Sequence, residues 1–469
     1  MAAGNATSRH GRTSKGWHRA VFAVCLLVAA SLTAAGRPTG AQGSGRPFAT
    51  PIQHVVLILQ ENHSFDNVLG ALCAQATTRA QPCDGVTTGA LNTGEVIPLA
   101  RAGDFVPEVL HTGDAQTTAI DNGKMDGYSL IVGCTGPQHV CYSQYQPSQI
   151  PNVAALANRF VISDRTFEDA PKASWGSHLS AIAGTLDGFV AGIPHYGRSP
   201  LRGPGWGCDS GDDAGWSTAT GRVIQVPSCV PKPDGTGPYR ASPVAYTPTI
   251  MDRVSGARLN WKLYVGLPGG LPGNQSGYGW AICPTFAECI YGSKKRNMVA
   301  NGQIISDATK GTLPNFAVVT PNQLNSQHNG DSMTVGDNWI GQVVSAIEHG
   351  PDWSSTAIFI SWDDCGCFYD HVPPPSGTGI RLPMLIVSPY ARPVTTDSNP
   401  ASFASVLAFT ESVFGLTPLT ANDATAYNYL LSFDFTQPPL APVPMTQTSI
   451  PAAEQHAIDA NPPDPNDPT

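Results

Sequence analysis

The sequence predicts an α/β fold in which a mostly parallel central sheet is flanked by helices. One observation is a set of short apolar runs, rich in β-branched residues, without alternation of apolar and polar positions. Such runs are typical of strands that are buried on both faces, as in parallel sheets. The other is that segments between these runs carry apolar residues at helical spacings of three and four. Strands that alternate with helices favour an α/β domain.

The expected strands and helices follow in order along the chain. Each expected strand is an uninterrupted apolar run, and these runs are 54–59, 316–320, 356–360 and 383–387. Each expected helix shows the helical spacing, and these segments are 153–160, 250–254, 340–347 and 403–414. Gly415 directly follows the last of them, where a glycine commonly ends a helix.

One large domain, residues 54–436, is expected between two less regular ends. The Gly-, Ser- and Pro-rich residues 42–53 indicate a linker. Residues 186–247 are rich in Gly, Pro and Trp, which indicates a long loop-rich insertion over the sheet. In residues 437–469 Pro dominates and periodicity stops, so we expect a disordered tail there.

The N-terminus has the form of a secretory signal peptide. A short apolar run, residues 20–35, is preceded by four basic residues, Arg9, Arg12, Lys15 and Arg19. A basic segment, an apolar stretch and small residues are the parts of a signal peptide. We therefore expect residues 1–41 to direct secretion to the cell envelope or the medium, with cleavage after Ala35 or Ala41. A retained membrane anchor is the alternative.

The charge balance excludes one class of function. Of the 26 Lys and Arg, five lie in residues 1–41, which hold no Asp or Glu. The remainder therefore carries 21 basic and 35 acidic residues, a net charge of −14. An acidic chain without basic runs is a poor nucleic-acid binder, so that class is set aside. Nothing in the sequence implies a stable protein partner.

The cysteines are expected to form disulfides. Of eleven cysteines, Cys25 lies in the apolar N-terminal run. The other ten form neighbouring pairs, Cys73/Cys83, Cys134/Cys141, Cys208/Cys229, Cys283/Cys289 and Cys365/Cys367. An even number in an exported chain favours disulfides over zinc ligands. The ring between positions 365 and 367 should be strained and easily reduced.

Polar clusters directly follow three of the expected strands. Glu61 and Asn62 follow the first, Asp363 and Asp364 follow the strand at 356–360, and His328 lies beyond the strand at 316–320. In open α/β sheets ligands gather at the carboxyl ends of strands. Carboxylate and amide oxygens suit a divalent cation, Ca²⁺, Mg²⁺ or Zn²⁺. The alternative is that each cluster merely caps a turn or helix.

A hydroxyl nucleophile is available at the start of another expected helix. Ser174 and Ser177 lie where a loop becomes a helical pattern that continues to Gly184. Unpaired N–H groups at a helix N-terminus favour a phosphate and help to ionise a hydroxyl. Because serine is also a common helix cap, this signal is weak by itself.

Several segments together resemble the bacterial phosphoesterase family of phospholipases C and acid phosphatases, in the alkaline-phosphatase-like superfamily. The segments that carry the resemblance are ENHSFD at 61–66, NGKMDGY at 122–128, SDRTF at 163–167, WKLY at 261–264 and FYDHVPP at 368–374. The match extends from about residue 54 to 435, where SFDF at 432–435 resembles the end of the family's catalytic domain. The occurrence of ENHSFD and FYDHVPP in this order is specific to the family.

The resemblance implies a hydrolase with one metal ion and a Ser or Thr nucleophile. By position, Glu61, Asn62, Asp363 and Asp364 match metal ligands, and Ser174 matches the nucleophile, whose oxygen would also bind the metal. His111 and His328 match histidines near the phosphate, where they would hydrogen-bond phosphoryl oxygens or protonate the leaving group.

Two departures from the family pattern concern this site. Asp363-Asp364 is followed by Cys365-Gly-Cys367, where the family has Asp-Glu and Gly-Gly. The shorter carboxylate changes the reach of one ligand. After the nucleophile position the chain has Gly176-Ser177-His178, where the family has Pro-Asn-Arg or Pro-Asn-His, so Ser177 is a second, lower-ranked nucleophile.

The expected function is that of a secreted metal-dependent phosphoric ester hydrolase. Overall likeness favours a phospholipase C-like enzyme that forms a phosphoserine and meets a phospholipid at a membrane surface. A broad acid phosphatase of the same family is the alternative. A surface-binding protein that has lost turnover is the alternative of another class.

Overall fold

The computed structural model describes residues 50–75, 79, 81–190, 192–196, 203–268 and 276–460. All of these belong to the larger of two units into which the chain divides, residues 43–469. The signal peptide expected at residues 1–41, and residues 42–49 of the expected linker, lie outside the described residues. The end of that linker is packed, because Ile52 is buried and the Gln53 N–H donates to the Ser355 carbonyl.

A twisted sheet forms the centre of the fold. Its strands are β1 (His54–Gln60), β6 (Val161–Ser163), β10 (Trp261–Val265), β11 (Met298–Ala300), β12 (Phe316–Val319), β13 (Thr356–Trp362), β14 (Met384–Val387) and β15 (Thr395–Asp397). They are ordered β11-β10-β12-β1-β13-β14-β6-β15. Every neighbouring pair is parallel except those of β14, which runs antiparallel to β13 and to β6. The expected mostly parallel sheet is therefore confirmed.

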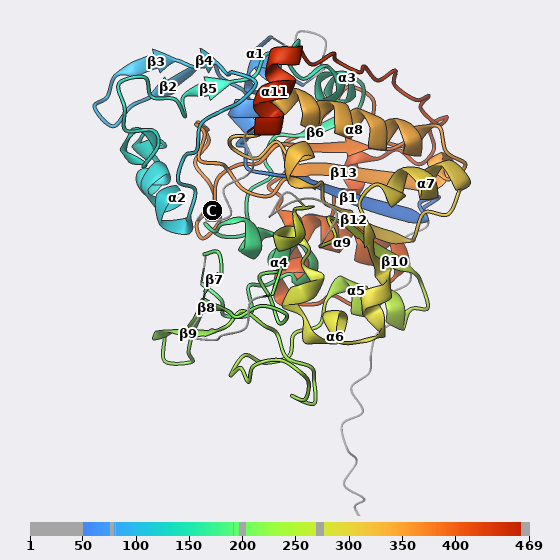
Figure 1. The fold of residues 1–469 in the computed structure, drawn as a ribbon. Helices are drawn as coiled ribbons and strands as arrows, with labels where there is room; N and C mark the ends of the chain where they lie inside the picture. The colour runs from blue at the N-terminus through green and yellow to red at the C-terminus, as the bar shows by residue number, and fades with distance from the viewer. Residues whose placement is uncertain are drawn as a thin grey trace, which may run out of the picture. The chain divides into compact units, whose positions relative to one another are not determined.

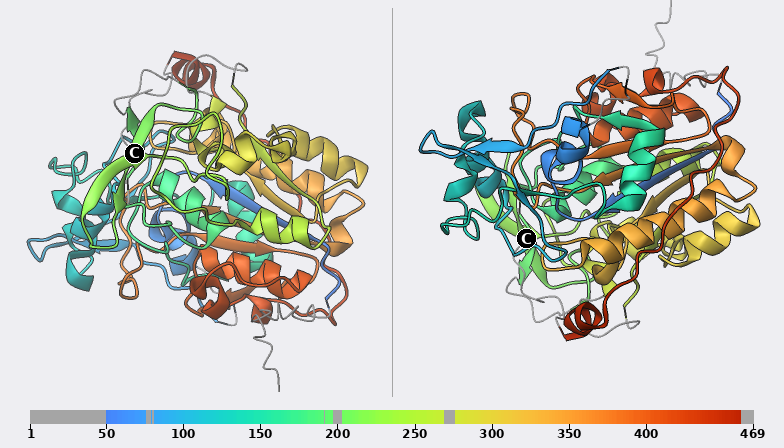
Figure 2. Two further views of the ribbon diagram at one scale, coloured as in Figure 1. Left: turned by 90° about the horizontal axis from the view of Figure 1, so that it is seen from below. Right: turned by 90° about the horizontal axis from the view of Figure 1, so that it is seen from above.

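Helices cover both faces of this sheet. In chain order they are α1 (Ala71–Gln75), α2 (Gly113–Ile120), α3 (Pro151–Arg159), α4 (Ser174–Ala183), α5 (Ile250–Gly256), α6 (Ala287–Ile290), α7 (Gln303–Lys310), α8 (Met333–Glu348), α9 (Phe403–Phe414), α10 (Ala421–Thr425) and α11 (Ala452–Ala460). Helices α3, α7 and α8 lie on one face, and α4, α5 and α9 lie on the other (Figures 1 and 2). Two-sided cover explains why every residue of β12, β13 and β14 is buried. Within the described residues, no helix has both the length and the apolar character needed to cross a membrane.

Short strands lie outside the central sheet. They are β2 (Thr88–Ala90), β3 (Val96–Pro98), β4 (Ala100–Arg101), β5 (Ser143–Gln144), β7 (His195–Tyr196), β8 (Asp212–Ser217) and β9 (Val223–Pro227). The last three form an antiparallel sheet within the expected insertion at 186–247. The Cys208–Cys229 disulfide closes a loop in the same insertion.

Four of the five expected disulfides form, and the fifth is wrong. The four are Cys73–Cys83, Cys134–Cys141, Cys208–Cys229 and Cys283–Cys289. Cys365 and Cys367 are buried free thiols whose sulfur atoms lie 2.7 Å apart. Gly366 and Cys367 both have positive φ, and the Cys367 N–H donates to the Cys365 sulfur. This tight turn holds the two sulfur atoms close together without a bond between them.

The expectation of a disordered tail is wrong for residues 437–460. The Val443 N–H donates to Glu348 Oε2 at 3.0 Å, and Asn152 exchanges two hydrogen bonds with the backbone of Thr446. The segment crosses the face covered by α3 and α8 and ends in α11 (Figure 2). Proline-rich backbone lacks periodicity, yet side-chain amides and a carboxylate satisfy its polar groups. Residues 461–469 lie outside the described residues.

Candidate active site

The register of the two central strands brings the first two polar clusters together. Gln60 at the end of β1 is paired with Trp362 at the end of β13. Glu61-Asn62 and Asp363-Asp364 therefore leave the sheet side by side at its carboxyl edge. The Asp363 N–H donates to the Gln60 carbonyl at 2.9 Å, and the Asn62 N–H donates to Asp363 Oδ1 at 3.0 Å. These two bonds fix both chain turns against each other.

Helix α4 delivers Ser174 to the same place. Ser174 is the first residue of the helix and is fully buried, and Ala173 precedes it in an extended conformation. Ser174 Oγ lies 3.2 Å from Asn62 Oδ1 and 3.2 Å from Asp364 Oδ2. The structure thus brings together all five residues that the sequence suggested as metal ligands, from three distant parts of the chain. We call Glu61, Asn62, Ser174, Asp363 and Asp364 the oxygen cluster.

The amide of Asn62 lies between this cluster and the two candidate histidines. One terminal amide atom lies 2.9 Å from Asp363 Oδ1, 3.3 Å from Glu61 Oε2 and 3.2 Å from Ser174 Oγ. The other lies 2.9 Å from His111 Nε2 and 2.8 Å from His328 Nε2. The amide can therefore face the cluster with its oxygen or with its nitrogen.

The outer contacts of the histidines favour the orientation with the oxygen in the cluster. Nδ1 of His111 lies 2.7 Å from the Val109 carbonyl, and Nδ1 of His328 lies 2.9 Å from the Asn329 carbonyl. Each Nδ1 must donate its proton, so Nε2 of each neutral imidazole accepts from the Asn62 NH₂. Oδ1 of Asn62 then faces only oxygen atoms, an arrangement that a cation completes.

Burial makes the carboxylates of the cluster hard to ionise without a cation. Burial, then the neighbouring Asp363 carboxylate, raises the pKa of Glu61 well above its usual value. The same two causes raise the pKa of Asp364. Oδ2 of Asp363 is buried without a hydrogen-bond partner. An acceptor-rich, buried and partly unsatisfied group fits a divalent cation with oxygen ligands.

A model of the phosphoesterase family matches residues 52–417. The chain belongs to the phosphoesterase family. The resemblance inferred from the sequence motifs is therefore confirmed, and the match covers both strand ends and α4.

Curated relatives of this phosphoesterase include bacterial and plant phospholipases C. Phospholipase C A of Mycobacterium tuberculosis is 23% identical over 448 residues, covering 83% of this chain and 78% of the relative. Non-hemolytic phospholipase C of Burkholderia pseudomallei is 23% identical, covering 77% of this chain and 55% of the relative. Non-specific phospholipase C3 of Arabidopsis thaliana is 20% identical, covering 76% of this chain and 66% of the relative. This phosphoesterase is accordingly a phosphoric ester hydrolase.

Solved structures resemble the phosphoesterase only distantly. A Vibrio parahaemolyticus protein in the alkaline phosphatase superfamily is 11% identical, with a TM-score of 0.36 and coverage of 82% of this chain and 72% of that chain. A phosphonate monoester hydrolase of Agrobacterium radiobacter is 13% identical, with a TM-score of 0.33 and coverage of 80% and 74%. With scores this low, the evidence for the fold class is the topology of the sheet itself.

His178 belongs to the site, although the sequence patterns did not single it out. It lies four residues after Ser174 on α4, and its Nε2 is 3.0 Å from Glu61 Oε1 and 3.7 Å from Asp363 Oδ2. Burial lowers its pKa, which favours the neutral imidazole. The spacing of four from Ser174, which puts both on one helix face, was the available signal. Ser177, the lower-ranked nucleophile, is buried and its Oγ has no hydrogen-bond partner.

The acidic residues of the two family motifs have a different role. Asp66 of ENHSFD and Asp370 of FYDHVPP both contact the buried Arg381 guanidinium, at 3.2 and 3.1 Å. The ring of His371 lies 2.5 Å from Asp66 Oδ2. Although Asp66, Asp370 and His371 lie close enough to share an ion, the guanidinium already supplies the positive charge. This group therefore locks the two motifs together.

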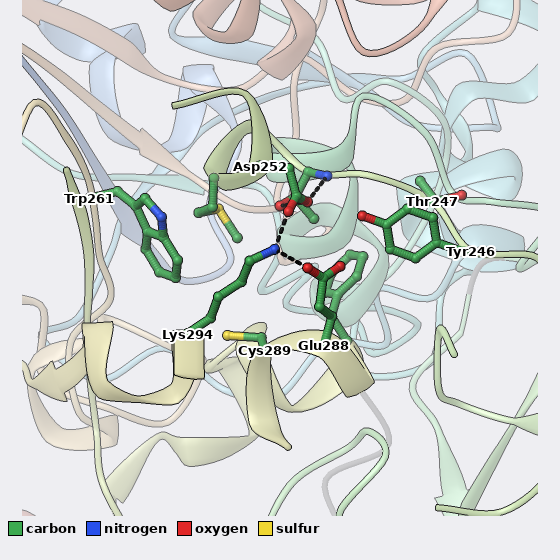
Figure 3. A pocket seen from close by; sticks show the side chains of 10 residues that line it. Tyr246, Thr247, Asp252, Trp261, Glu288, Cys289 and Lys294 are labelled. Atoms are coloured by element: carbon green, nitrogen blue, oxygen red, sulfur yellow. Dashed lines mark hydrogen bonds and ion pairs between the residues drawn. The ribbon is translucent and has the colours of Figure 1, made fainter. Parts of the chain in front are cut away.

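A small cavity between α5 and α6 is a weaker candidate for a functional site. The Lys294 ammonium lies between the carboxylates of Asp252 and Glu288 (Figure 3). The charges compensate each other, and the free space of about 10 Å³ holds at most one water molecule. A structural ion pair accounts for this cavity.

Proposed function

We propose that this phosphoesterase is a secreted, metal-dependent enzyme that cleaves phospholipids in the manner of phospholipase C, through a phosphoserine at Ser174. The observation that supports it most directly is the contact of Ser174 Oγ with Asn62 Oδ1 and Asp364 Oδ2, inside a buried group of acceptors. A hydroxyl held among ligand oxygens at a helix N-terminus suits nucleophilic attack on phosphorus.

The residues of the oxygen cluster would hold one divalent cation. Such an ion would lower the pKa of the Ser174 hydroxyl and offset negative charge on the phosphoryl group. In the proposed reaction Ser174 Oγ forms a bond to phosphorus, and the P–O bond to the diacylglycerol breaks. The Ser174 hydroxyl gives up its proton and the leaving oxygen takes one up, so that no proton is lost overall. His111 and His328, near the Asn62 amide, would deliver this proton only in their protonated form, not in the neutral form that accepts from the amide. Water then hydrolyses the phosphoserine and regenerates the serine.

Two observations support the substrate class and the location. The relatives with the broadest coverage are named phospholipases C, which favours a phosphodiester over a phosphomonoester. The basic and apolar N-terminal segment and the four disulfides favour an exported protein.

The decisive experiment compares two chromogenic esters with purified exported protein. p-Nitrophenyl phosphorylcholine is a diester, whereas p-nitrophenyl phosphate is a monoester. We expect faster hydrolysis of the diester, loss of activity with a chelator, and recovery when Ca²⁺, Mg²⁺, Mn²⁺ or Zn²⁺ is added singly. Phosphatidylcholine vesicles should yield diacylglycerol and phosphocholine.

Other results would redirect the proposal. Preference for the monoester would indicate a phosphatase, and activity that a chelator leaves unchanged would contradict metal dependence. No hydrolysis of either ester with every metal would favour a binding protein on the same fold.

A further inference from the structure

His178 is a buried imidazole at the site that the proposed reaction does not use. It is 2% exposed, and its Nε2 faces two carboxylates, Glu61 at 3.0 Å and Asp363 at 3.7 Å. Both neighbours are acceptors, so Nε2 must carry the proton to be satisfied. The shorter distance is a hydrogen bond in which Nε2–H donates to Glu61 Oε1.

The two oxygens of each carboxylate point in different directions. Glu61 Oε2 and Asp363 Oδ1 are the oxygens within 3.3 Å of the Asn62 amide atom in the oxygen cluster. Glu61 Oε1 and Asp363 Oδ2 are the oxygens that face His178. We call the first pair the inner oxygens and the second pair the outer oxygens. His178 thus contacts the carboxylates through other oxygens than those that face Asn62.

We propose that His178 is a positioning residue, whose Nε2–H holds the outer oxygen of Glu61 so that its inner oxygen faces Asn62 in the oxygen cluster. The proposal rests on the proposed function, in which the oxygen cluster holds a divalent cation. Hydrogen bonds from behind a ligating carboxylate fix its orientation and tune metal affinity.

Helix α4 connects this positioning role to the nucleophile. Ser174 and His178 are separated by one turn of α4, so one rigid element carries both the hydroxyl and the group that orients Glu61. The position of α4 therefore affects both the nucleophile and the orientation of one carboxylate.

Direct ligation by His178 is the competing arrangement. Glu61, His178 and Asp363 offer atoms within 4.8 Å of one another, which is close enough to share an ion. In that arrangement Nε2 of His178 would bind the ion with its lone pair and could not carry a proton.

The test uses two substitutions and one control on the same helix. His178→Leu removes the donor, and His178→Gln keeps an N–H of similar reach. Ser180→Ala, a buried change on another face of α4, is the matched control. Apparent metal affinity is measured as metal content across a series of metal buffers, alongside kcat, KM and the melting temperature without metal.

We expect His178→Leu to weaken metal binding by about 10- to 100-fold. Its kcat should recover at high metal, with KM unchanged, and the melting temperature without metal should not fall below that of Ser180→Ala. His178→Gln should bind metal much more tightly than His178→Leu. A merely structural role would lower the melting temperature without this metal rescue.

Several results would overturn the inference. Metal binding by His178→Leu equal to wild type would exclude a positioning role. A strong nitrogen coupling in pulsed EPR of the Mn²⁺ form, absent only in the His178 variants, would show direct ligation instead. If the wild type retains no divalent cation and hydrolyses neither ester, the proposed function itself fails. If the wild type shows metal-dependent hydrolysis and the His178 variants bind metal as the wild type does, only the positioning role is excluded.

Discussion

Asn62 is the residue on which both sides of the site depend. It adopts a left-handed backbone conformation, with φ of 61°, directly after β1. This conformation is more accessible to asparagine than to most residues and turns the chain sharply at the strand end. The side chain then reaches the carboxylates with one amide atom and the two histidines with the other. One short amide therefore sets the spacing between the oxygen cluster and the imidazoles.

At the nucleophile, Ser174→Ala should reduce turnover by at least about 10³-fold, because no other described hydroxyl contacts the oxygen cluster. Folding should persist, since the change removes side-chain contacts that contribute about 1 kcal/mol each. Steady-state hydrolysis and circular dichroism of the same samples check both parts. Ser177→Ala is the control and should keep activity within about tenfold of wild type. If Ser177→Ala is inactive while Ser174→Ala remains active, the nucleophile is Ser177, about one turn further along α4.

The raised pKa of Glu61 predicts how the metal-free protein responds to pH. The folded state holds the Glu61 proton more tightly than the unfolded chain does, so stability falls as pH rises above the usual carboxyl range. Chelation should therefore lower the melting temperature more at pH 8 than at pH 5. In chelator at pH 8, Glu61→Gln should melt above wild type, because its buried side chain carries no charge. Exposed Glu95→Gln should show no such gain. Equal chelator effects at the two pH values would contradict this explanation.

At the scale of elements, the sequence predicted those parts whose pattern is local. The strand runs at 54–59 and 356–360 lie within β1 and β13 because strands covered on both faces are apolar throughout. Glu61 and Asp364 were placed in the site because strand ends meet at one edge of a sheet. The contact of His178 with Glu61 could not be predicted from the sequence, because it depends on where α4 packs against the sheet. The ordered C-terminal segment also depends on tertiary contacts that have no sequence period, such as that of Val443 with Glu348.

The link between the two motifs yields a prediction about stability. Arg381 is fully buried between Asp66 and Asp370, which are 304 residues apart in the chain. Arg381→Met should destabilise the protein by about 3–5 kcal/mol, because it leaves buried carboxylates without their cation. Urea unfolding at neutral pH measures the loss. Arg101→Met, at an exposed arginine, should cost little. A loss below about 1 kcal/mol would mean that the group is not what holds the motifs together.

For the molecule as a whole, the C-terminal segment closes one side of the sheet. Burial raises the pKa of Glu348 to about 7, and its Oε2 accepts from the Val443 N–H. Asn152 and Asn338 each exchange hydrogen bonds with the backbone of this segment. Residues of the segment thus satisfy polar groups of α3 and α8 that would otherwise be left without partners.

Removal of residues 437–469 should therefore destabilise the fold more than it affects the chemistry. Each buried polar group left unsatisfied costs about 1–3 kcal/mol, partly offset by water that reaches the exposed helices. The truncated protein should unfold at lower urea while keeping metal-dependent hydrolysis at low temperature. Truncation after residue 460, which keeps residues 437–460, is the control. Wild-type stability without residues 437–469 would show that these contacts contribute nothing.

The position of β1 in the sheet has a consequence for synthesis. This strand is apolar and buried, and it is the first strand of the domain, yet its two neighbours are β12 and β13. Val55 pairs with Phe316 and with Ala357, so roughly 260 residues must be made before either edge of β1 can be covered. At a translation rate of about 5–20 residues per second, that interval is about 13–50 seconds. Throughout it a seven-residue segment of high β-propensity has no partner in its own chain. During that interval β1 is therefore open to pairing with other chains.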